Sequence, residues 1–433
     1  MRILVVGSGG VGDAVARIAA RRTFFDLMVL ADNDVSRAER SAAAARAAAP
    51  AGREGCFLAA TVDAGDPAAV TALAREHGIT HVLNAVDPRF VMPVFEGAYA
   101  AGADYLDMAM SLSRPHAGEP HSRPGVKLGD EQFASADRWA GAGRLALVGM
   151  GVEPGLSDVF ARYASDHLFS HITELGTRDG SNLVVVDENG EEIFAPSFSI
   201  WTTIEECLNP PVIWEKAHAG DPDGGWRTVP PFHEPEVFDF PGGIGPVECV
   251  HVEHEEVLLM PRFLDADRVT FKYGLGEEFI SVLRTLHRLG LDSTTPVRVR
   301  SADSATGRAA VSPRDVVAAC LPDPATLGER MRGVTCAGLL VTGTGKDGQP
   351  REVYLHHLVD NAWSMAEYGA QCVVWQTAIN PVVALELLAR GTWTGSGVLG
   401  PEAFDAVPFL DLLSAPAPTG YGSPWALQER PPA

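Results

Sequence analysis

The sequence predicts an α/β protein in which a Rossmann-type doubly wound parallel sheet is followed by a second, α+β domain. Three observations predict this class. The 433 residues are too many for one ordinary domain. Short apolar runs alternate with helical patterns through the first 150 residues, which is typical of a parallel sheet covered by helices. After residue 151 the alternation gives way to extended segments with few helices between them.

In the first domain, residues 1–150, six apolar runs are the predicted strands and five helical patterns lie between and after them. The predicted strands are residues 3–6, 27–31, 57–62, 81–86, 105–108 and 145–148, and the predicted helices are residues 12–22, 36–49, 67–77, 88–101 and 130–140. An insertion rich in proline and glycine, residues 111–129, interrupts this rhythm. We expect it to form a loop over the carboxyl edge of the sheet, where such folds carry function.

The second domain, residues 151–390, is predicted to be a sheet with helices on one face. Extended segments are expected at residues 171–176, 183–186, 194–203, 237–240, 247–260, 269–271 and 297–300, and helices at residues 156–167, 277–289 and 362–390. A hairpin is expected at residues 339–354, turning at Lys346-Asp347-Gly348, and the last helix is expected to be interrupted at Asn380-Pro381. Residues 391–433 form a third segment, rich in glycine and proline.

Composition narrows the classes of partner. The formal net charge of −22 and the absence of a basic cluster argue against nucleic acid, while an acidic surface can attract a cation such as a polyamine. No apolar stretch approaches the about 20 residues that span a bilayer, and residues 2–6 read as a strand rather than a secretory leader. The six cysteines are far apart, so we expect reduced thiols in a cytoplasmic protein and no metal site.

A glycine-rich loop between the first strand and the first helix predicts a dinucleotide site, formed by Gly7, Ser8, Gly9, Gly10, Val11 and Gly12. Gly7 permits the tight turn, Gly9 lets the backbone approach a pyrophosphate, and Gly12 lets helix and strand pack closely. Asp32 closes the second strand, where a carboxylate accepts hydrogen bonds from the adenosine ribose and repels a 2′-phosphate. NAD is therefore predicted, with NADP less favoured, although Arg37 lies close enough to soften that preference.

Strand ends further along supply other cofactor and substrate candidates. Asp63 follows the third strand and is placed to reach the adenine, whereas Asp66 is explained as a helix cap ahead of Pro67. Near the topological switch point, Asn84, Ala85 and Val86 are assigned to the cofactor, Asp87 to the substrate, and Asp107 to both cofactor binding and catalysis. Plain strand-to-helix turns are the competing explanation for these two strand ends.

The glycine-rich segment at residues 149–155 ends the sixth predicted strand and opens a helix. Its candidates for substrate binding are Gly151, Glu153, Pro154 and Gly155. Glycines there would let a ligand approach the backbone, the helix N-terminus would hold a carboxylate or the nicotinamide amide, and Glu153 would pair with an ammonium. The competing explanation is a helix cap with a proline near its start.

A cluster of titratable groups lies at residues 251–256, in the order His-Val-Glu-His-Glu-Glu, which matches no zinc-protease motif. In an extended segment alternate side chains share a face, so His254 with Glu256 is one possible pair and His251 with Glu255 the other. His254 and Glu255 join Asp107 as catalytic candidates, and a solvated strand edge is the alternative.

Further candidates for a general base, and one for an aromatic wall of the substrate site, lie elsewhere in the second domain. Trp201, in the stretch 199–209, offers an aromatic wall for a flexible amine, and a place in the core is the equal alternative. Lys216 and Lys272 are further general-base candidates of lower weight.

Several of these motifs, in this order and spacing, resemble the saccharopine dehydrogenase family, which includes saccharopine reductase, lysine ε-dehydrogenase and carboxynorspermidine dehydrogenase. They are GSGGVG at the N-terminus, NAVDP and YLDMA at two strand ends, GMGVEPG before a helix, FSIWTTIEECLNPPV, VECVHVEHEE, LRTLHRLGL and the C-terminal GSGVLGPEAF. The resemblance covers nearly the whole chain. The sequence departs from NADP-using members by carrying Asp32, and the insertion at residues 111–129 is not typical of the better-known members.

The resemblance implies a Rossmann domain, a substrate-binding and dimerisation domain, and a C-terminal segment, residues 391–433, that returns toward the first domain. It also implies a homodimer and an enzyme that reversibly oxidises a C–N bond of an amino-acid-derived amine, with hydride transfer to NAD(P) and hydrolysis of an imine. A polyamine dehydrogenase acting on a carboxylated spermidine-type or homospermidine-type substrate is the nearest alternative. A non-catalytic module that senses NAD(H) is the alternative from another class.

Overall fold

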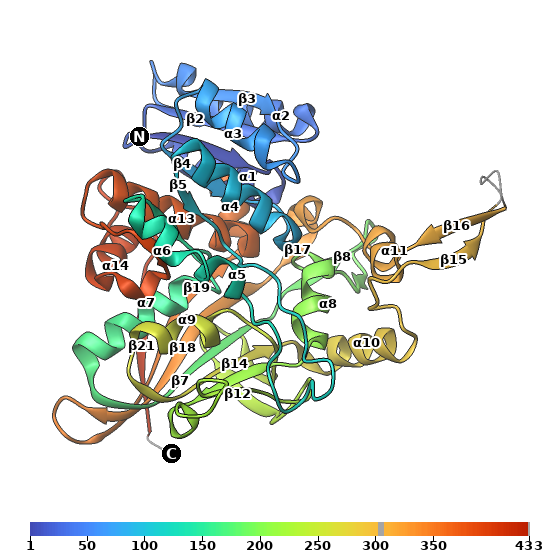
Figure 1. The fold of residues 1–433 in the computed structure, drawn as a ribbon, viewed down its shortest axis with the longest axis vertical. Coiled ribbons are helices and arrows are strands. Elements are labelled where there is room, and N and C mark those ends of the chain that lie inside the picture. Colours follow the sequence, from blue (N-terminus) through green and yellow to red (C-terminus); the bar gives the residue numbers. More distant parts are fainter. Residues whose placement is uncertain (302–306, 432–433) are drawn as a thin grey trace.

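The computed structural model describes residues 1–301 and 307–431, which form two domains (Figure 1). Apolar side chains of both domains belong to one continuous core, in which residues of the first strand and of the central strands of the second sheet are fully buried. The domains are therefore packed firmly against each other, and the principal cavity lies where they meet.

The first domain is a seven-stranded parallel sheet, in the strand order β20-β6-β5-β4-β1-β2-β3. Its strands are β1 (Arg2–Val6), β2 (Leu27–Asp32), β3 (Phe57–Thr61), β4 (His81–Asn84), β5 (Asp104–Leu106), β6 (Leu145–Leu147) and β20 (Gly397–Leu399). Its helices are α1 (Gly10–Ala20), α2 (Val35–Ala48), α3 (Pro67–Glu76), α4 (Val91–Ala101), α5 (Asp130–Phe133) and α6 (Ala136–Gly141). The order of the first six strands, reversing between β1 and β4, confirms the predicted Rossmann-type fold.

Local chemistry explains why these elements begin and end where they do. The side chain of Asp34 accepts a hydrogen bond from the second residue of α2, and that of Asp66 does the same for α3, where Pro67 occupies the first position. Gly102 ends α4 in the left-handed conformation. The cap predicted for Asp66 is confirmed. By contrast, α1 begins after Gly9 with no side-chain cap, so its first N–H groups are left for another partner.

The second domain is built on a mixed nine-stranded sheet, most of whose neighbours are antiparallel. Its strands are β7 (Phe169–Ser181), β10 (Val212–Glu215), β11 (Trp226–Thr228), β12 (Glu236–Phe240), β13 (Gly245–His251), β14 (Ala266–Gly274), β18 (Val334–Gly345), β19 (Pro350–Asp360) and β21 (Trp425–Arg430). The predicted α+β class is confirmed, as is the hairpin between β18 and β19. The two strands that flank the cavity most closely, β7 and β14, run parallel and side by side.

Helices and two small sheets complete the second domain. The helices of this part of the chain are α7 (Leu156–Tyr163), α8 (Ile200–Leu208), α9 (Glu256–Phe263), α10 (Gly276–Arg288), α11 (Pro313–Cys320), α12 (Asn361–Tyr368), α13 (Cys372–Ala389) and α14 (Ala406–Ser414). The small sheets contain β8 (Val184–Val186), β9 (Glu192–Ile193) and β17 (Met331–Arg332) in one, and β15 (Val297–Arg300) and β16 (Arg308–Val311) in the other.

Three predicted elements of the second domain are wrong. The extended segment expected over residues 194–203 gives way to α8 at Ile200, because Ser199 caps this helix and its apolar side chains fall on one face. The extended segment expected over residues 247–260 ends at His251, and α9 begins at Glu256. The interruption expected at Asn380-Pro381 instead falls at Gly369, which takes a left-handed φ of 64° between α12 and α13.

The C-terminal segment is divided between both domains. Strand β20 pairs in parallel with β6, whereas β21 pairs with β19 at the edge of the second sheet. Helix α13 precedes the C-terminal segment in the chain, and it also packs against the first domain, at α1. It is also long and apolar enough to cross a membrane by length and composition, but 83% of it is buried inside the protein, as expected of a core helix.

Candidate functional site

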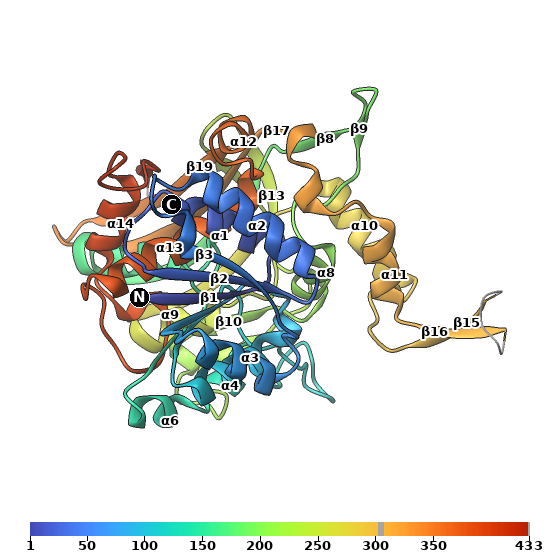
Figure 2. The ribbon, with the colours of Figure 1, turned by 90° about the horizontal axis from the view of Figure 1, so that it is seen from above.

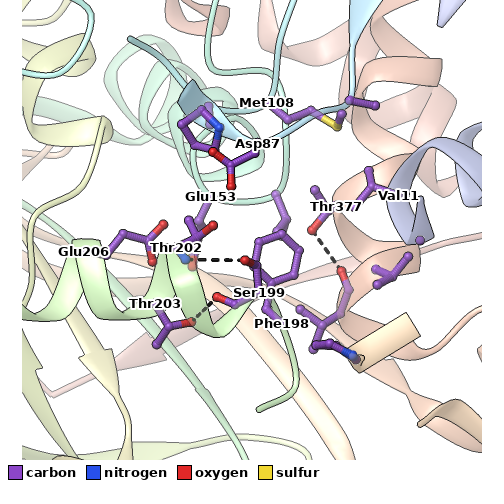
Figure 3. A pocket seen from close by; sticks show the side chains of 18 of the residues that line it. Val11, Asp87, Met108, Glu153, Phe198, Ser199, Thr202, Thr203, Glu206 and Thr377 are labelled. Atoms are coloured by element: carbon purple, nitrogen blue, oxygen red, sulfur yellow. Dashed lines mark hydrogen bonds between the residues drawn. The ribbon is translucent and has the colours of Figure 1, made fainter. Parts of the chain in front are cut away.

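A cavity of about 310 Å³ lies at the carboxyl edge of the Rossmann sheet, between the two domains (Figure 3). The first domain contributes the start of α1 and the loops after β4 and β5, and the second contributes residues from β7, β14, α8 and α13. The described residues that line it are Gly10, Val11, Asn84, Ala85, Val86, Asp87, Pro88, Asp107, Met108, Ala109, Val152, Glu153, Pro154, Asp179, Phe198, Ser199, Thr202, Thr203, Glu206, His254, Glu255, Tyr273, Asp323, Pro324, Ala325, Val373, Val374 and Thr377.

The glycine loop has the shape that a dinucleotide pyrophosphate requires. Gly7 takes a positive φ of 101°, and a Cβ there would lie 2.6 Å from the carbonyl oxygen of Ala85. A Cβ on Gly12 would lie 1.9 Å from the carbonyl oxygen of Gly7, so helix and strand approach too closely for a side chain. At Gly9 the Cβ position faces open space. Together with the uncapped start of α1, this space suits a bound diphosphate.

Asp32 lies at the end of β2 and is held rigidly by the backbone. One carboxylate oxygen accepts from the N–H of Ser8 at 2.8 Å, and the other accepts from the N–H of Asp34 at 3.0 Å. Its side chain is buried at the rim of the glycine loop. A carboxylate fixed in this place can accept from ribose hydroxyls with its remaining lone pairs. Of the other residues assigned to the cofactor, Asp63 is exposed and closes its own turn by accepting from Gly65.

Asp107 follows β5 and is completely buried, with one face on the cavity. Its carboxylate accepts from the N–H of Gly149 and from the side-chain amide of Gln132, both at 2.7 Å. Asn84, which also lines the cavity, donates to the hydroxyl of Tyr105 at 3.0 Å. Burial raises the pKa of Asp107 to about 7, although these donors oppose the shift. A carboxyl group that titrates near neutral pH is suited to proton transfer.

The segment at residues 149–155 is folded on itself rather than open to a ligand at its glycines. Gly151 donates to the carbonyl oxygen of Pro154, and a Cβ on Gly155 would lie 2.2 Å from the carbonyl oxygen of Gly151. The side chain of Asp158 already accepts from the N–H of Gly155 at the start of α7. Asp158 thus takes the N–H of Gly155, and the binding of a ligand at this helix N-terminus stays a prediction. Glu153 and Pro154 do line the cavity.

His254 and three glutamates form a buried cluster where β13 gives way to α9. The Nδ1 atom of His254 lies 2.5 Å from Glu256 and 3.4 Å from Glu255, and its ring stacks on Phe271 at 3.9 Å. Burial by itself would lower the pKa of His254, but Glu256, Glu255 and Glu206 around it raise the value to about 10. The imidazole is therefore a cation at neutral pH, and Nε2 is its remaining donor.

The alternative pair of His251 with Glu255 does not form. His251 lies on the far side of the strand, where its ring nitrogens contact the carbonyl oxygen of Phe271 at 3.0 Å and Glu234 at 3.4 Å. Of the two pairs that alternation allowed, the contact of His254 with Glu256 is present and that of His251 with Glu255 is not, because the strand ends at His251 and the chain then turns into α9. Neither lysine candidate lines the cavity, since Lys216 pairs with Asp265 and Lys272 with Glu236.

Trp201 does not form the aromatic wall that the sequence suggested. Its indole is buried behind the cavity, with the guanidinium groups of Arg89 and Arg314 at 4.4 and 4.7 Å from the ring. The reason is that residues 200–208 are helical, which turns this side chain away from the cavity and toward α11. Phe198 and Tyr273 supply the aromatic surface instead.

The cavity has a second set of buried acids that the motifs did not reveal. Asp179 extends from β7 beside Tyr273 of β14, its partner in the parallel register. Burial raises the pKa of Asp179 to about 7 and that of Glu206 to about 8. Burial and the neighbouring Asp179 raise the pKa of Glu153 well above its usual range. Glu174 and Arg178 lie on the same strand, so no sequence signal singles out Asp179.

The charge of the cavity wall is strongly one-sided. Seven carboxyl groups line it: Asp87, Asp107, Glu153, Asp179, Glu206, Glu255 and Asp323. No lysine or arginine is found among the described lining residues, which leaves protonated His254 as the cation there. Figure 3 shows Asp87, Glu153 and Glu206 around the cavity. Such a wall favours a ligand with several positive charges and very few negative ones.

Two family models match consecutive parts of the chain. The saccharopine dehydrogenase NADP binding domain matches residues 3–147, and the saccharopine dehydrogenase C-terminal domain matches residues 151–415. The chain belongs to the saccharopine dehydrogenase family. The predicted resemblance is confirmed, and with it the expectation of an NAD(P)-dependent dehydrogenase of this family.

Relatives match this chain along nearly its whole length. A carboxynorspermidine synthase of Vibrio alginolyticus is 28% identical over 100% of this chain and 98% of its own length. A carboxyaminopropylagmatine dehydrogenase of Synechocystis is 28% identical over 98% of this chain and 96% of its own length. Among solved structures, saccharopine dehydrogenase (L-Glu forming) from Saccharomyces cerevisiae has a TM-score of 0.66 at 14% identity, covering 99% of this chain and 100% of that one, which shows a shared fold.

Proposed function

We propose that this member of the saccharopine dehydrogenase family forms or oxidises a C–N bond of a carboxylated polyamine, using NAD(P). The observation that carries the proposal is the cavity wall, with its seven carboxyl groups and one protonated histidine. A carboxylated polyamine has the matching charges, because it carries several ammonium groups and one carboxylate. The names of the two relatives, carboxynorspermidine synthase and carboxyaminopropylagmatine dehydrogenase, support the same class of substrate.

The wall also distinguishes this substrate class from saccharopine. Saccharopine carries three carboxylates, and a wall with seven carboxyl groups and one cation cannot pair their charges. Only His254 offers a positive charge among the described residues of the wall, which is enough for a single carboxylate. We therefore favour the polyamine substrate over saccharopine and over lysine.

In this proposal each group of the wall has a separate task. His254 donates from Nε2 to the substrate carboxylate, while Glu256 holds its ring in place. Glu206, Glu153 and Asp179 hold the ammonium groups. A nicotinamide dinucleotide held by the glycine loop and Asp32 would supply the hydride acceptor or donor for the carbon of the C–N bond. Asp107 accepts the proton that the substrate amine must lose before that carbon is oxidised, and returns it in the opposite direction.

The cofactor in this proposal is NAD rather than NADP. The supporting observation is the carboxylate of Asp32, which the N–H groups of Ser8 and Asp34 fix at the rim of the glycine loop. A fixed negative charge at the ribose end of the site opposes a 2′-phosphate. We further propose that the enzyme acts in the cytoplasm, because the six cysteines are all free thiols.

The test is a steady-state assay that follows the absorbance of reduced nicotinamide. The purified chain is given NAD or NADP in the oxidative direction, with carboxynorspermidine, carboxyspermidine, carboxyaminopropylagmatine, saccharopine and lysine as separate substrates. We expect a carboxylated polyamine with NAD to have the highest kcat/KM. Preference for saccharopine or lysine would overturn the substrate proposal, and preference for NADP would overturn the cofactor proposal.

A further inference from the structure

The chain between β5 and β6 carries the insertion at residues 111–129, which closes on itself. Arg114 and Val126 exchange backbone hydrogen bonds in both directions, at 2.8 and 2.9 Å, and Gly129 donates to the carbonyl oxygen of Ser111 at 2.9 Å. Helix α5 begins directly after this loop, and Figure 2 shows the next helix, α6, on the same side of the Rossmann strands as α4, opposite α1 and α2. The two ends of the insertion are therefore held together at the start of α5.

The insertion also contacts the second domain, beside the acids of the cavity. The hydroxyl of Ser113 donates to the carboxylate of Glu253 at 2.8 Å. The N–H of Met110, immediately before the insertion, donates to Glu255 at 3.1 Å, and Glu255 lines the cavity. Contacts from both domains thus fix the place of the insertion.

Gln132 of α5 joins the insertion to Asp107. Its side chain is fully buried, with Nε2 donating to Asp107 at 2.7 Å and Oε1 accepting from the N–H of Ser111 at 2.8 Å. Because a backbone N–H can only donate, the amide oxygen must face Ser111 and the amide nitrogen must face Asp107. The insertion therefore decides which end of the amide Asp107 meets.

The carboxyl group of Asp107 is held at both oxygens. One oxygen accepts from the N–H of Gly149 and the other from Gln132, each at 2.7 Å. Two titratable side chains also face it, Tyr105 from β5 and Glu255 from the start of α9. Burial raises the pKa of Asp107 to about 7, and Glu255 adds to that shift, whereas Gly149, Gln132 and Tyr105 oppose it. The amide of Gln132 thus stabilises the form of Asp107 that can accept a proton.

We propose that Gln132 is a positioning residue for proton transfer, because its amide nitrogen holds the carboxylate of Asp107 in the orientation that accepts the proton of the substrate amine. This inference rests on the proposed function, in which Asp107 is the base. Without the amide donor, one oxygen of Asp107 loses its partner, and the neutral form, which cannot accept a proton, becomes favoured. Gln132 is not among the described residues that line the cavity, so it acts through Asp107 rather than on the substrate.

The test is the pH dependence of kcat and KM in the oxidative direction for two variants. Gln132→Glu keeps an oxygen for the N–H of Ser111 but replaces the donor to Asp107 by a second carboxyl group. The rise of the oxidation rate near pH 7 should move upward by about one unit or more, so kcat at pH 6 should fall about tenfold and recover as pH rises. Gln132→Met, which removes the donor without adding an acid, should move the rise in the same direction by less. KM should change little in both variants.

Controls separate positioning from a general effect on folding. The matched control Gln349→Glu makes the same substitution at an exposed turn between β18 and β19 and should leave the pH profile unchanged. Thermal melting of each variant checks that the chain is folded. A fall of kcat by the same factor at every pH would assign Gln132 a structural role only and overturn the inference.

The variant Asp107→Asn distinguishes failure of this inference from failure of the proposed function. If Asp107→Asn abolishes the rise near pH 7 while both Gln132 variants keep it in place, the inference is overturned and the proposed function stands. If Asp107→Asn also keeps the rise, Asp107 is not the base, and the proposed roles of Asp107 and Gln132 fail together.

Discussion

Replacing His254 by glutamine tests how the cavity recognises its substrate. Glutamine keeps a donor that can reach Glu256 but removes the positive charge that burial among Glu256, Glu255 and Glu206 maintains. The hydroxyl of Ser157 still donates to Glu256 at 3.0 Å, so that buried carboxylate retains a partner. The perturbation is therefore mainly electrostatic.

The expected size follows from the interaction that is lost. A hydrogen bond between charged groups contributes about 1.5–3 kcal/mol, which corresponds to roughly a 10- to 150-fold change in an equilibrium. The KM for a carboxylated polyamine should rise by that factor in His254→Gln. A polyamine without a carboxylate, such as norspermidine, should inhibit equally well or better, because the variant has removed a positive charge that repels it.

The assay compares these two ligands in the same enzyme preparation. The matched control is His251→Gln, which replaces a buried histidine three positions earlier that does not line the cavity. That control should change neither KM nor inhibition. Equal weakening of both ligands in His254→Gln would refute the assignment of His254 to the carboxylate, as would an unchanged KM.

The remaining predictions concern the cofactor, proton transfer and pH. Asp32→Asn keeps an acceptor for the N–H of Ser8 but removes the negative charge. The ratio of kcat/KM with NAD to kcat/KM with NADP should therefore fall by about tenfold or more, and an unchanged ratio would contradict the role of Asp32. Asp107→Asn should lower kcat about 100-fold. It should also abolish a rise of the oxidation rate with pH near 7, because the carboxyl group acts as a base only when deprotonated. A preserved pH profile would exclude Asp107 as the base. Binding of a polyamine at neutral pH should release protons, because its positive charge favours ionisation of groups such as Glu206, whose pKa burial raises to about 8. Calorimetry in buffers of different ionisation enthalpy measures the number of protons released, and a value of zero would contradict this prediction. Glu402 is fully buried, and burial raises its pKa to about 8, so the stability that its neutral form provides is lost as pH rises from about 4.5 through 8. Glu402→Gln should therefore change the melting temperature little at pH 4 and raise it increasingly toward pH 9, and a shift independent of pH would refute this reasoning.

The first domain could be predicted from sequence because its signals are local. The alternation of buried strands and helices, the glycine loop and the cap at Asp66 all depend on residues close together in the chain. The second domain was harder because its segments are short and depend on distant partners. An extended segment was predicted over residues 194–203, yet the chain is helical from Ile200, since Ser199 caps α8 and this helix packs on α10 and α11.

The candidate site shows the same division. Asp107 stood out at the end of a predicted strand and His254 in a cluster of titratable groups, and both line the cavity. Asp179 carried no motif, because its importance comes only from its place beside Tyr273 in the parallel register of β7 and β14. The folding of residues 149–155 onto themselves was likewise hidden, since Gly151 and Gly155 serve a close backbone contact rather than a ligand.

By itself, the sequence determined the Rossmann fold, the family, and the presence of a nicotinamide site, because each rests on short motifs whose backbone geometry admits few side chains. Only the tertiary structure decided which acids share one cavity, that His254 is held as a cation among them, and that Trp201 lies behind the wall. The physical reason is that a pKa and an electrostatic field depend on burial and on neighbours from β7, α8 and α9, which lie far apart in the chain.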